Sequence, residues 1–156
     1  MTLSIDALVG GWQLVRWEIS YGDGRPSTLP FGPEASGLLV YAPDGSMSKG
    51  GRSQLGAESA RFAHADARLA AFDSFFSYGG RYRVLEEDGV PYVIHSVTQA
   101  LNPGLAGTEQ KRAMQFGADG TLTLSASDTV PVSGVARLHR LVWKRFARSD
   151  ASSGQM

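Results

Sequence analysis

The stretch Tyr92–Phe116, YVIHSVTQALNPGLAGTEQKRAMQF, indicates two β-strands joined by a Pro-Gly turn. Side chains alternate between the two faces of a strand with a period of two. Alternation places these residues on one face of each strand: Val93, His95, Val97 and Gln99 on the first, and Gln110, Arg112, Met114 and Phe116 on the second. If both faces line a barrel, their polar groups lie among apolar walls, which is typical of a small-molecule site.

Length and composition favour one domain with a sizeable core, because the chain has 156 residues and is 42% hydrophobic. Fifteen basic and fifteen acidic residues give a formal net charge of zero, so we expect neither nucleic acid nor a membrane as a partner. Without cysteine there is no disulfide framework, thiolate nucleophile or Cys-ligated metal. The N-terminal sequence MTLSIDALVGGW has no signal-peptide pattern, and no stretch reaches the roughly 18 apolar residues of a membrane span. We expect a cytoplasmic protein, either a monomer or a homodimer.

Asp-Gly occurs four times, at positions 23, 44, 88 and 119, each time between runs rich in β-forming residues. This pattern is a strong signal for β-hairpins. The predicted strands are Gly10–Tyr21, Gly37–Tyr41, Ser46–Gly50, Arg81–Glu86, Tyr92–Leu101, Thr108–Phe116, Thr121–Ala126 and Ala136–Phe146. Eight antiparallel strands in meander order close into a barrel, which removes exposed edges. The predicted fold class is therefore all-β, an up-and-down barrel of about eight strands with one short helix and an internal cavity.

The helix is predicted over Ala65–Ser77, where large apolar residues recur at helical spacing, Asp66 can cap the N-terminus and Gly79-Gly80 ends the pattern. The proline-rich connection Arg25–Ser36 could cover a barrel mouth, since proline lacks a ladder donor. Residues 147–156 are small and polar and indicate a disordered tail, which leaves 1–146 as a single domain.

Seven short motifs follow one another along nearly the whole chain. They are Leu8–Glu18 as L-x-G-x-W-x-L-x-x-x-E, Pro30-Phe31-Gly32-Pro33, Gly37–Ser48 as G-x-L-x-Y-x-P-D-G-x-M-S, Tyr78-x-Gly80-x-Tyr82, His95-x-Val97, Pro103–Arg112 as P-x-x-x-G-T-x-Q-x-R, and Leu141-Val142-Trp143. In these motifs the chain resembles the lipocalin-like domain family of bacteria and fungi, a branch of the calycin-type barrels. The resemblance implies an up-and-down barrel with an internal cavity. Calycin-type barrels include carriers as well as cofactor-free enzymes, so the resemblance does not choose an activity.

Two residues of the opening stretch are candidates for chemistry. His95 lies in mid-strand among valines, and imidazole is suited to general acid-base catalysis near neutral pH. The alternative for His95 is a core histidine satisfied by one hydrogen bond. Arg112 would face inward, where a guanidinium must be paired or must meet an anion. The alternative for Arg112 is a structural ion pair with Glu18 or Glu109.

Tyrosine hydroxyls can donate to a ligand carbonyl, and Tyr82 joins His95 and Arg112 in the predicted catalytic set; the alternative for the tyrosines is a place in the barrel wall. The predicted ligand-binding residues are Trp12, Tyr41, Met47, Tyr78, Val97, Gln99, Gln110, Met114 and Trp143. Tryptophans, including Trp17, can equally pack one end of the barrel. The predicted register sets Val97 opposite Arg112 and Gln99 opposite Gln110, with Lys111 outside, because an unpaired lysine is costly to bury.

No metal site is predicted, because His64, His95 and His139 lie on a loop and two distant strands without a local ligand pair. His139 is flanked by charged residues and is expected to be peripheral. The sequence has no G-x-S-x-G elbow and no Walker or dinucleotide pattern, so no nucleotide or other cofactor is predicted.

These observations predict binding of a small, mostly hydrophobic molecule with a carbonyl, phenol or carboxylate head. One hypothesis is a cofactor-independent isomerase, cyclase or lyase acting by proton transfer on a carbonyl or phenolic, polyketide-like substrate. His95 would then be the acid or base, and Arg112 would stabilise a developing enolate or phenolate. The other hypothesis is a non-catalytic carrier, in which both residues only anchor the ligand.

Overall fold

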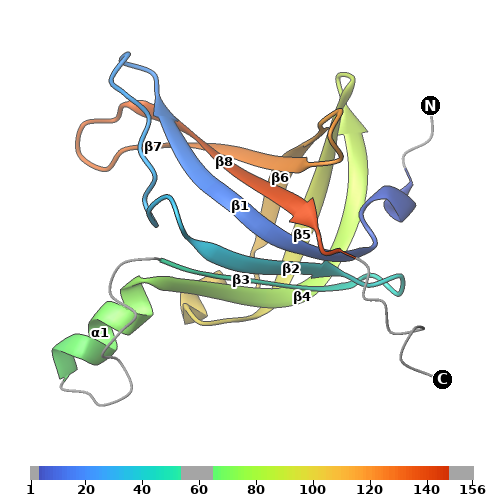
Figure 1. Cartoon of the computed structure of the whole chain (residues 1–156), viewed down its shortest axis with the longest axis horizontal. Helices are drawn as coiled ribbons and strands as arrows, with labels where there is room; N and C mark the ends of the chain where they lie inside the picture. Colours follow the sequence, from blue (N-terminus) through green and yellow to red (C-terminus); the bar gives the residue numbers. More distant parts are fainter. Residues whose placement is uncertain (1–3, 54–64, 148–156) are drawn as a thin grey trace.

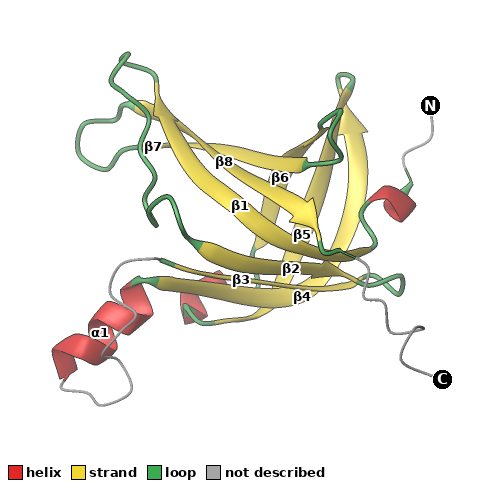
Figure 2. Cartoon of the chain, viewed as in Figure 1, coloured by secondary structure: helices red, strands yellow, loops and turns green. Residues whose placement is uncertain are grey.

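A computed structural model of the chain describes residues 4–53 and 65–147. Eight antiparallel strands form a closed barrel in which each strand pairs with its sequence neighbours and the last pairs with the first (Figure 1, Figure 2). The strands are β1 (Gly10–Tyr21), β2 (Ser36–Tyr41), β3 (Ser46–Arg52), β4 (Phe75–Glu87), β5 (Val90–Ala100), β6 (Glu109–Phe116), β7 (Leu122–Thr129) and β8 (Ala136–Arg145). Helix α1 (Ala65–Asp73) precedes β4, and the 3-10 turns η1 (Ile5–Ala7) and η3 (Pro103–Leu105) precede β1 and β6. The predicted up-and-down barrel is confirmed.

Three of the four Asp-Gly pairs form hairpin turns, between β2 and β3, β4 and β5, and β6 and β7. In the second of these, Asp88 and Gly89 have φ angles of 52° and 79°. Two successive positive φ angles match the right-handed twist of the flanking strands. The pair at Asp23 only ends β1, because the proline-rich connection of residues 22–35 follows it.

The helix is shorter than predicted. α1 ends at Asp73 and β4 begins at Phe75, so the Gly-Gly pair that was expected to end the helix lies within a strand. The physical reason is that Phe76 and Tyr78 alternate with period two and pack against the barrel interior, which overrides the helical spacing of the sequence. Asp66 lies within α1, and its side chain is outside the described part of the chain.

A β-bulge in β1 changes which side chains face inward. The register of β1 against β8 shifts between Leu14 and Arg16, which leaves Val15 as an extra residue. Strict alternation would direct Arg16 inward after Leu14. The bulge instead turns Trp17 toward the interior, where it lines the pocket described below.

A second bulge lies in β5 and corrects the predicted face of one residue. The pairing of β4 with β5 shifts between Gly79 and Gly80, so that Thr98 is the extra residue. Gln99 therefore does not share the inner face with His95 and is exposed. The prediction that both lie on one face is wrong, because a single inserted residue inverts the alternation beyond it.

Two predictions concern the pairing of β5 with β6. The inward orientation of Arg112 is confirmed, and the predicted register of the two strands is wrong. Val93, not Val97, lies opposite Arg112, because the ladder with β6 ends at Ser96, before the bulge. His95, not Gln99, lies opposite Gln110. The difference is an even number of residues, so Gln110 and Arg112 keep the face predicted for them. Arg112 lines the interior pocket and Lys111 is exposed, as predicted.

One end of the barrel interior is packed solid. Its inward side chains are buried and include Trp12, Leu39, Tyr41, Met47, Tyr82, Val93, Met114, Leu122 and Trp143. The Trp12 indole donates a hydrogen bond to the carbonyl of Leu8, 2.9 Å away, and the Arg145 guanidinium lies 4.3 Å from the centre of its ring. This packed end lies near η1, whereas α1 lies at the opposite end of the barrel (Figure 1).

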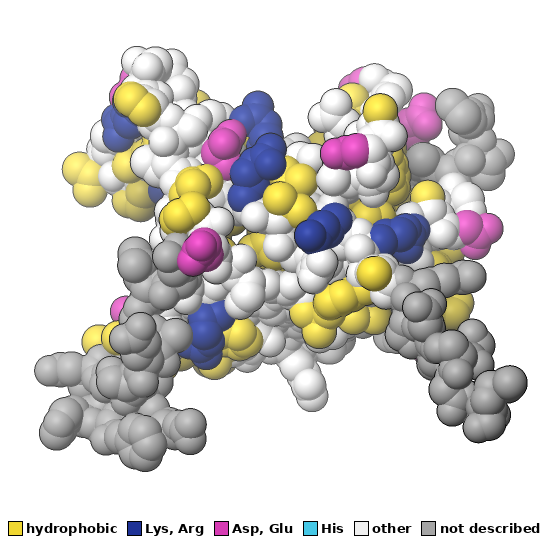
Figure 3. Space-filling model, viewed as in Figure 1, with side chains coloured by type: hydrophobic (Ala, Val, Ile, Leu, Met, Phe, Trp, Pro, Cys, Tyr) yellow, Lys and Arg dark blue, Asp and Glu magenta, His cyan; other side chains and the backbone are white. Residues whose placement is uncertain are grey.

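The outer surface carries mixed charges. Basic and acidic side chains are interspersed over the face shown in Figure 3. Exposed ion pairs join Arg83 to Glu109 at 2.6 Å and Lys111 to Glu87 at 2.5 Å, and such pairs contribute little to stability. None of the helices in the described part of the chain has the length and apolar character needed to cross a membrane.

The bulge in β5 predicts a large effect of Gly80→Ala. A Cβ at Gly80 would lie 2.0 Å from the backbone oxygen of Ser96, so the strands must separate to admit it. We expect a loss of about 2 kcal/mol or more in the free energy of unfolding, measured by urea titration of tryptophan fluorescence. Gly50→Ala is the matched control, because the nearest heavy atoms to its Cβ would lie 3.5 Å away. Equal losses in the two variants would contradict the tight approach at Gly80.

Candidate functional site

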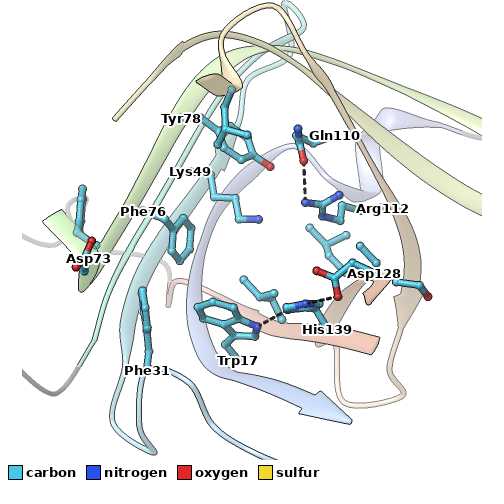
Figure 4. A pocket seen from close by; sticks show the side chains of 16 residues that line it. Trp17, Phe31, Lys49, Asp73, Phe76, Tyr78, Gln110, Arg112, Asp128 and His139 are labelled. Atoms are coloured by element: carbon cyan, nitrogen blue, oxygen red, sulfur yellow. Dashed lines mark hydrogen bonds and ion pairs between the residues drawn. The ribbon is translucent and has the colours of Figure 1, made fainter. Parts of the chain in front are cut away.

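The open end of the barrel contains a pocket of about 540 Å³ (Figure 4). Its lining residues come from six of the eight strands, from the loop before β2, and from α1 and η3. They are Trp17, Phe31, Lys49, Asp73, Phe75, Phe76, Tyr78, Leu105, Gln110, Arg112, Leu124, Ala126, Ser127, Asp128, His139 and Leu141. The volume falls within the range of ordinary small-molecule sites.

Three aromatic rings form one wall of the pocket. Trp17 lies edge-on to Phe31 and Phe76, with ring centroids 4.8 Å and 6.2 Å away. The proline-rich connection supplies Phe31 and so contributes to the wall at this end of the barrel. Aromatic rings in this arrangement offer a flat apolar surface to a ligand.

The polar side chains of the pocket include Lys49, whose amine lies between the rings of Phe76 and Tyr78. Lys49 lies in β3 opposite Tyr78 and is 5% exposed, and its Nζ lies 5.3 Å from the centre of the Tyr78 ring. In the described part of the chain no carboxylate forms a salt bridge with it. The sequence analysis missed Lys49, although it lies two positions after Met47, which was assigned to the ligand, and strand alternation gives the two residues the same face.

The environment of Lys49 favours its neutral form. Burial, together with the positive charge of Arg112, lowers the pKa of Lys49 to about 7. The amine is therefore a mixture of charged and neutral forms near neutral pH.

Arg112 faces the pocket beside Lys49 (Figure 4). Its Nη2 donates to the Gln110 side-chain oxygen at 3.2 Å, and its Nη1 donates to the backbone oxygen of Lys111 at 3.0 Å. Both acceptors are neutral. The alternative of an ion pair with Glu109 is wrong, because Glu109 pairs with Arg83 on the outer surface, and the structure records no ion pair to Glu18 either.

His95 is fully buried, with 0% exposure, and is held by two tyrosines. The Tyr41 hydroxyl lies 2.6 Å from its Nε2, and the Tyr78 hydroxyl lies 2.6 Å from its Nδ1. Burial, followed by the charges of Lys49 and Arg112, holds the pKa of His95 well below its usual range. The ring is therefore neutral, and one tyrosine must donate to it while the other accepts from it.

Tyr78 connects His95 to the pocket. It lines the cavity, whereas His95 does not, and its hydroxyl oxygen points into the space near Lys49 and Gln110 (Figure 4). Burial, partly offset by Arg112, raises the pKa of Tyr78 to about 12. Its hydroxyl is protonated at neutral pH and connects the buried His95 to the pocket by a hydrogen bond.

His139 lies at the pocket and not at the periphery, which corrects the expectation. Its Nδ1 accepts a hydrogen bond from the Trp17 indole at 3.2 Å, and its Nε2 lies 3.0 Å from a carboxylate oxygen of Asp128. Arg137 also binds Asp128 at 2.6 Å, and these hydrogen bonds, Arg137 first, lower the pKa of Asp128. The sequence does indicate this placement, because His139 alternates with the apolar residues Leu141 and Trp143 and so shares their face of the strand.

The structure brings some of the predicted site residues together in the pocket and separates others from it. Tyr78, Gln110 and Arg112 line the pocket. Those that lie buried away from the pocket lining are Trp12, Tyr41, Met47, Tyr82, His95, Val97, Met114 and Trp143. The Tyr82 hydroxyl donates to the backbone oxygen of Ala42 at 2.8 Å. His64 lies outside the described residues, which contain no group of three or more potential metal ligands.

A closed up-and-down barrel with a packed end and a pocket lined by apolar, polar and charged side chains defines a lipocalin-like barrel, an architecture suited to binding small molecules. Comparison with known families agrees with this class. The model of the lipocalin-like domain matches residues 9–146, and the chain belongs to that family. A search of the curated proteins found no match.

The buried lysine predicts an unusual dependence of stability on pH. The pKa of Lys49 is lower in the folded state than in the unfolded chain, so the unfolded state binds more protons between about pH 7 and pH 10. We expect Lys49→Met to raise the free energy of unfolding at pH 6 by an amount on the order of a few kcal/mol. The gain should shrink as the pH rises through this range, because the wild-type amine loses its charge.

Thermal and urea unfolding at pH 6, 8 and 10 measure this difference. Lys144→Met is the matched control, since Lys144 is exposed on β8 and has no burial cost to remove. A Lys49→Met variant that is less stable than the wild type, or whose gain does not change with pH, would contradict the charge burial described here.

Proposed function

We propose that the protein binds one small, mostly hydrophobic molecule in this pocket and acts on it as a cofactor-independent isomerase, cyclase or lyase. The ligand would be a carbonyl or phenolic compound of polyketide-like chemistry. The observation that carries the proposal is a pair of cationic side chains, Lys49 and Arg112, that face an apolar pocket with no carboxylate bound to either one among the described residues. Cations in such surroundings are costly unless an anionic or strongly polar ligand oxygen offsets their burial.

The pocket is lined by aromatic rings and by polar side chains, which supports a ligand with two unlike parts. The rings of Trp17, Phe31 and Phe76 suit an aromatic or polycyclic body. Arg112 has donors to offer an enolate, phenolate or carboxylate oxygen, and charge-assisted hydrogen bonds of this kind are stronger than neutral ones. Gln110 holds the guanidinium in place through its side-chain oxygen.

A proton path supports the enzymatic part of the proposal. The Tyr78 oxygen would take a proton from a carbon next to the ligand carbonyl while its own proton passes to Nδ1 of His95, 2.6 Å away. The negative charge would then rest on the ligand oxygen, beside Arg112. Return of the proton at another atom would complete an isomerisation or allow ring closure or elimination. Of the three candidate tyrosines, Tyr78 takes this role because Tyr41 and Tyr82 do not line the pocket.

A non-catalytic carrier is the second candidate, and one observation favours it. Both nitrogens of His95 are occupied by tyrosine hydroxyls, and the imidazole ring does not line the pocket. In a carrier, this hydrogen-bonded group would be purely structural, and Lys49 and Arg112 would only anchor the head of the ligand.

Binding is tested first. We expect native mass spectrometry, with a thermal-shift screen of aromatic ketones, phenols and carboxylates, to find complexes with one ligand per chain. Arg112→Met should weaken binding of the carboxylates by about ten- to a hundredfold, since a hydrogen bond to a charged group is lost. Arg83→Met is the control, because Arg83 lies outside the barrel in an exposed ion pair. Unchanged affinity in Arg112→Met would refute the proposed head-group contact.

Catalysis is tested with the compounds that bind. In an enzyme, His95→Gln and Tyr78→Phe should each lower turnover by roughly a hundredfold or more while binding stays within a few-fold. Incorporation of deuterium from D₂O next to the carbonyl, followed by mass spectrometry, measures proton transfer even when no product accumulates. Tyr92→Phe is the matched control, because Tyr92 lies away from the pocket, under the ammonium group of Lys111. Ligands recovered unchanged and without deuterium would identify a carrier.

A further inference from the structure

We propose that Lys49 is a nucleophile that forms an imine with an aldehyde or ketone held in the pocket. The inference rests on the proposed function only in that it assumes a carbonyl ligand. It assigns to Lys49 a covalent role in addition to the electrostatic role described above.

The placement of Lys49 carries the proposal. Its amine extends from β3 into the pocket between the rings of Phe76 and Tyr78, whose centres lie 5.4 Å and 5.3 Å away (Figure 4). No hydrogen bond or ion pair to a described residue occupies the nitrogen, so its lone pair is accessible once the amine is neutral. A carbonyl carbon bound in the pocket would meet this nitrogen directly.

The other two lysines of the sequence are unlike Lys49. Lys111 lies outside the barrel, where its ammonium binds Glu87 at 2.5 Å. Lys144 is exposed near the end of β8. The chain therefore has one internal and two external amines of the same chemistry, which provides a comparison within one molecule.

The surroundings also supply a neutral amine at neutral pH. Burial and the neighbouring Arg112 lower the pKa of Lys49 to about 7, so near pH 7 about half of the amines would be neutral. For an ordinary exposed lysine, only about one amine in 2500 is neutral at that pH. Burial among apolar groups and a nearby second cation is an established way to activate a lysine toward carbonyls.

The chemical step is balanced without any other reactant. The Lys49 nitrogen attacks the carbonyl carbon, and the carbonyl oxygen takes a proton from Tyr78, which recovers one from the amine, to give a carbinolamine. The C–O bond then breaks, and the oxygen leaves as water with the second amine proton, again relayed through Tyr78. The products are an imine and water, with no oxidation or reduction. Arg112 would stabilise the negative charge that develops on the oxygen during attack.

An imine at this position would serve the same proton-transfer chemistry. Once its nitrogen takes up a proton from solvent, the imine withdraws electrons from the adjacent carbon more strongly than a ketone does, so removal of a proton from that carbon becomes easier. The Tyr78 oxygen that is proposed to receive this proton lies on the same wall of the pocket as Lys49 (Figure 4).

Reductive trapping tests the proposal on the full chain. The protein is treated at pH 7 with limiting benzaldehyde and sodium cyanoborohydride, which converts an imine into a stable secondary amine, and the three lysines are quantified by peptide mapping. We expect modification of Lys49 to exceed that of Lys111 or Lys144 by at least about tenfold. The trapping rate at Lys49 should rise with pH to half of its maximum near pH 7. The preference should disappear in urea, where all three amines are equivalent.

Variants and a binding control complete the test. Lys49→Arg should abolish the internal modification while keeping the charge, and Lys144→Arg should leave it unchanged. Equal modification of the three lysines of the folded wild type, or modification only of Lys111 and Lys144, would overturn the proposal, and neither result depends on a variant that must fold. Failure of the proposed function looks different: phenols and carboxylates would form no complex in native mass spectrometry, whatever the fate of Lys49.

Discussion

The hydrogen-bonded group Tyr41–His95–Tyr78 is the interaction on which the interior of this barrel depends. A fully buried imidazole destabilises a protein unless both of its nitrogens find partners, and here each lies 2.6 Å from a tyrosine hydroxyl. The three residues come from β2, β5 and β4, so one hydrogen-bonded unit ties separate strands together across the interior. On one side of this unit the barrel is packed solid, and on the other it opens into the pocket.

The charges that line the pocket act on the same unit. His95 stays neutral because it is buried near Lys49 and Arg112. A neutral His95 adds no third positive charge next to these two side chains. The two cations still repel each other in an apolar space, which is unfavourable for stability in the absence of a ligand. Sites that bind or transform small molecules commonly contain groups that lower the stability of the fold in this way. Folding alone does not require Lys49 to be where it is.

Local patterns were sufficient for most of the fold. The Asp-Gly pairs at 44, 88 and 119 predicted their hairpins because an Asp-Gly turn needs only its own backbone geometry and two alternating strands. The helix was overextended because the spacing of Phe72 and Phe76 fits a helix locally, while burial of Phe76 against the barrel decides the matter globally. Residues within one strand, such as Gln110 and Arg112, were assigned to the correct face for the same local reason.

By itself, the sequence determined that this protein is an antiparallel barrel and that Tyr78, Gln110 and Arg112 face its interior, since hairpin turns and strand alternation are properties of neighbouring residues. Only the tertiary structure decided which of the inward residues meet at a pocket. Bulges in β1 and β5 turn Trp17 in and Gln99 out, because one extra residue inverts the alternation beyond it. The pairing of strands far apart in the chain decides which end of the barrel is packed solid and which end brings Lys49 beside Arg112. That pairing follows from closure of the whole barrel.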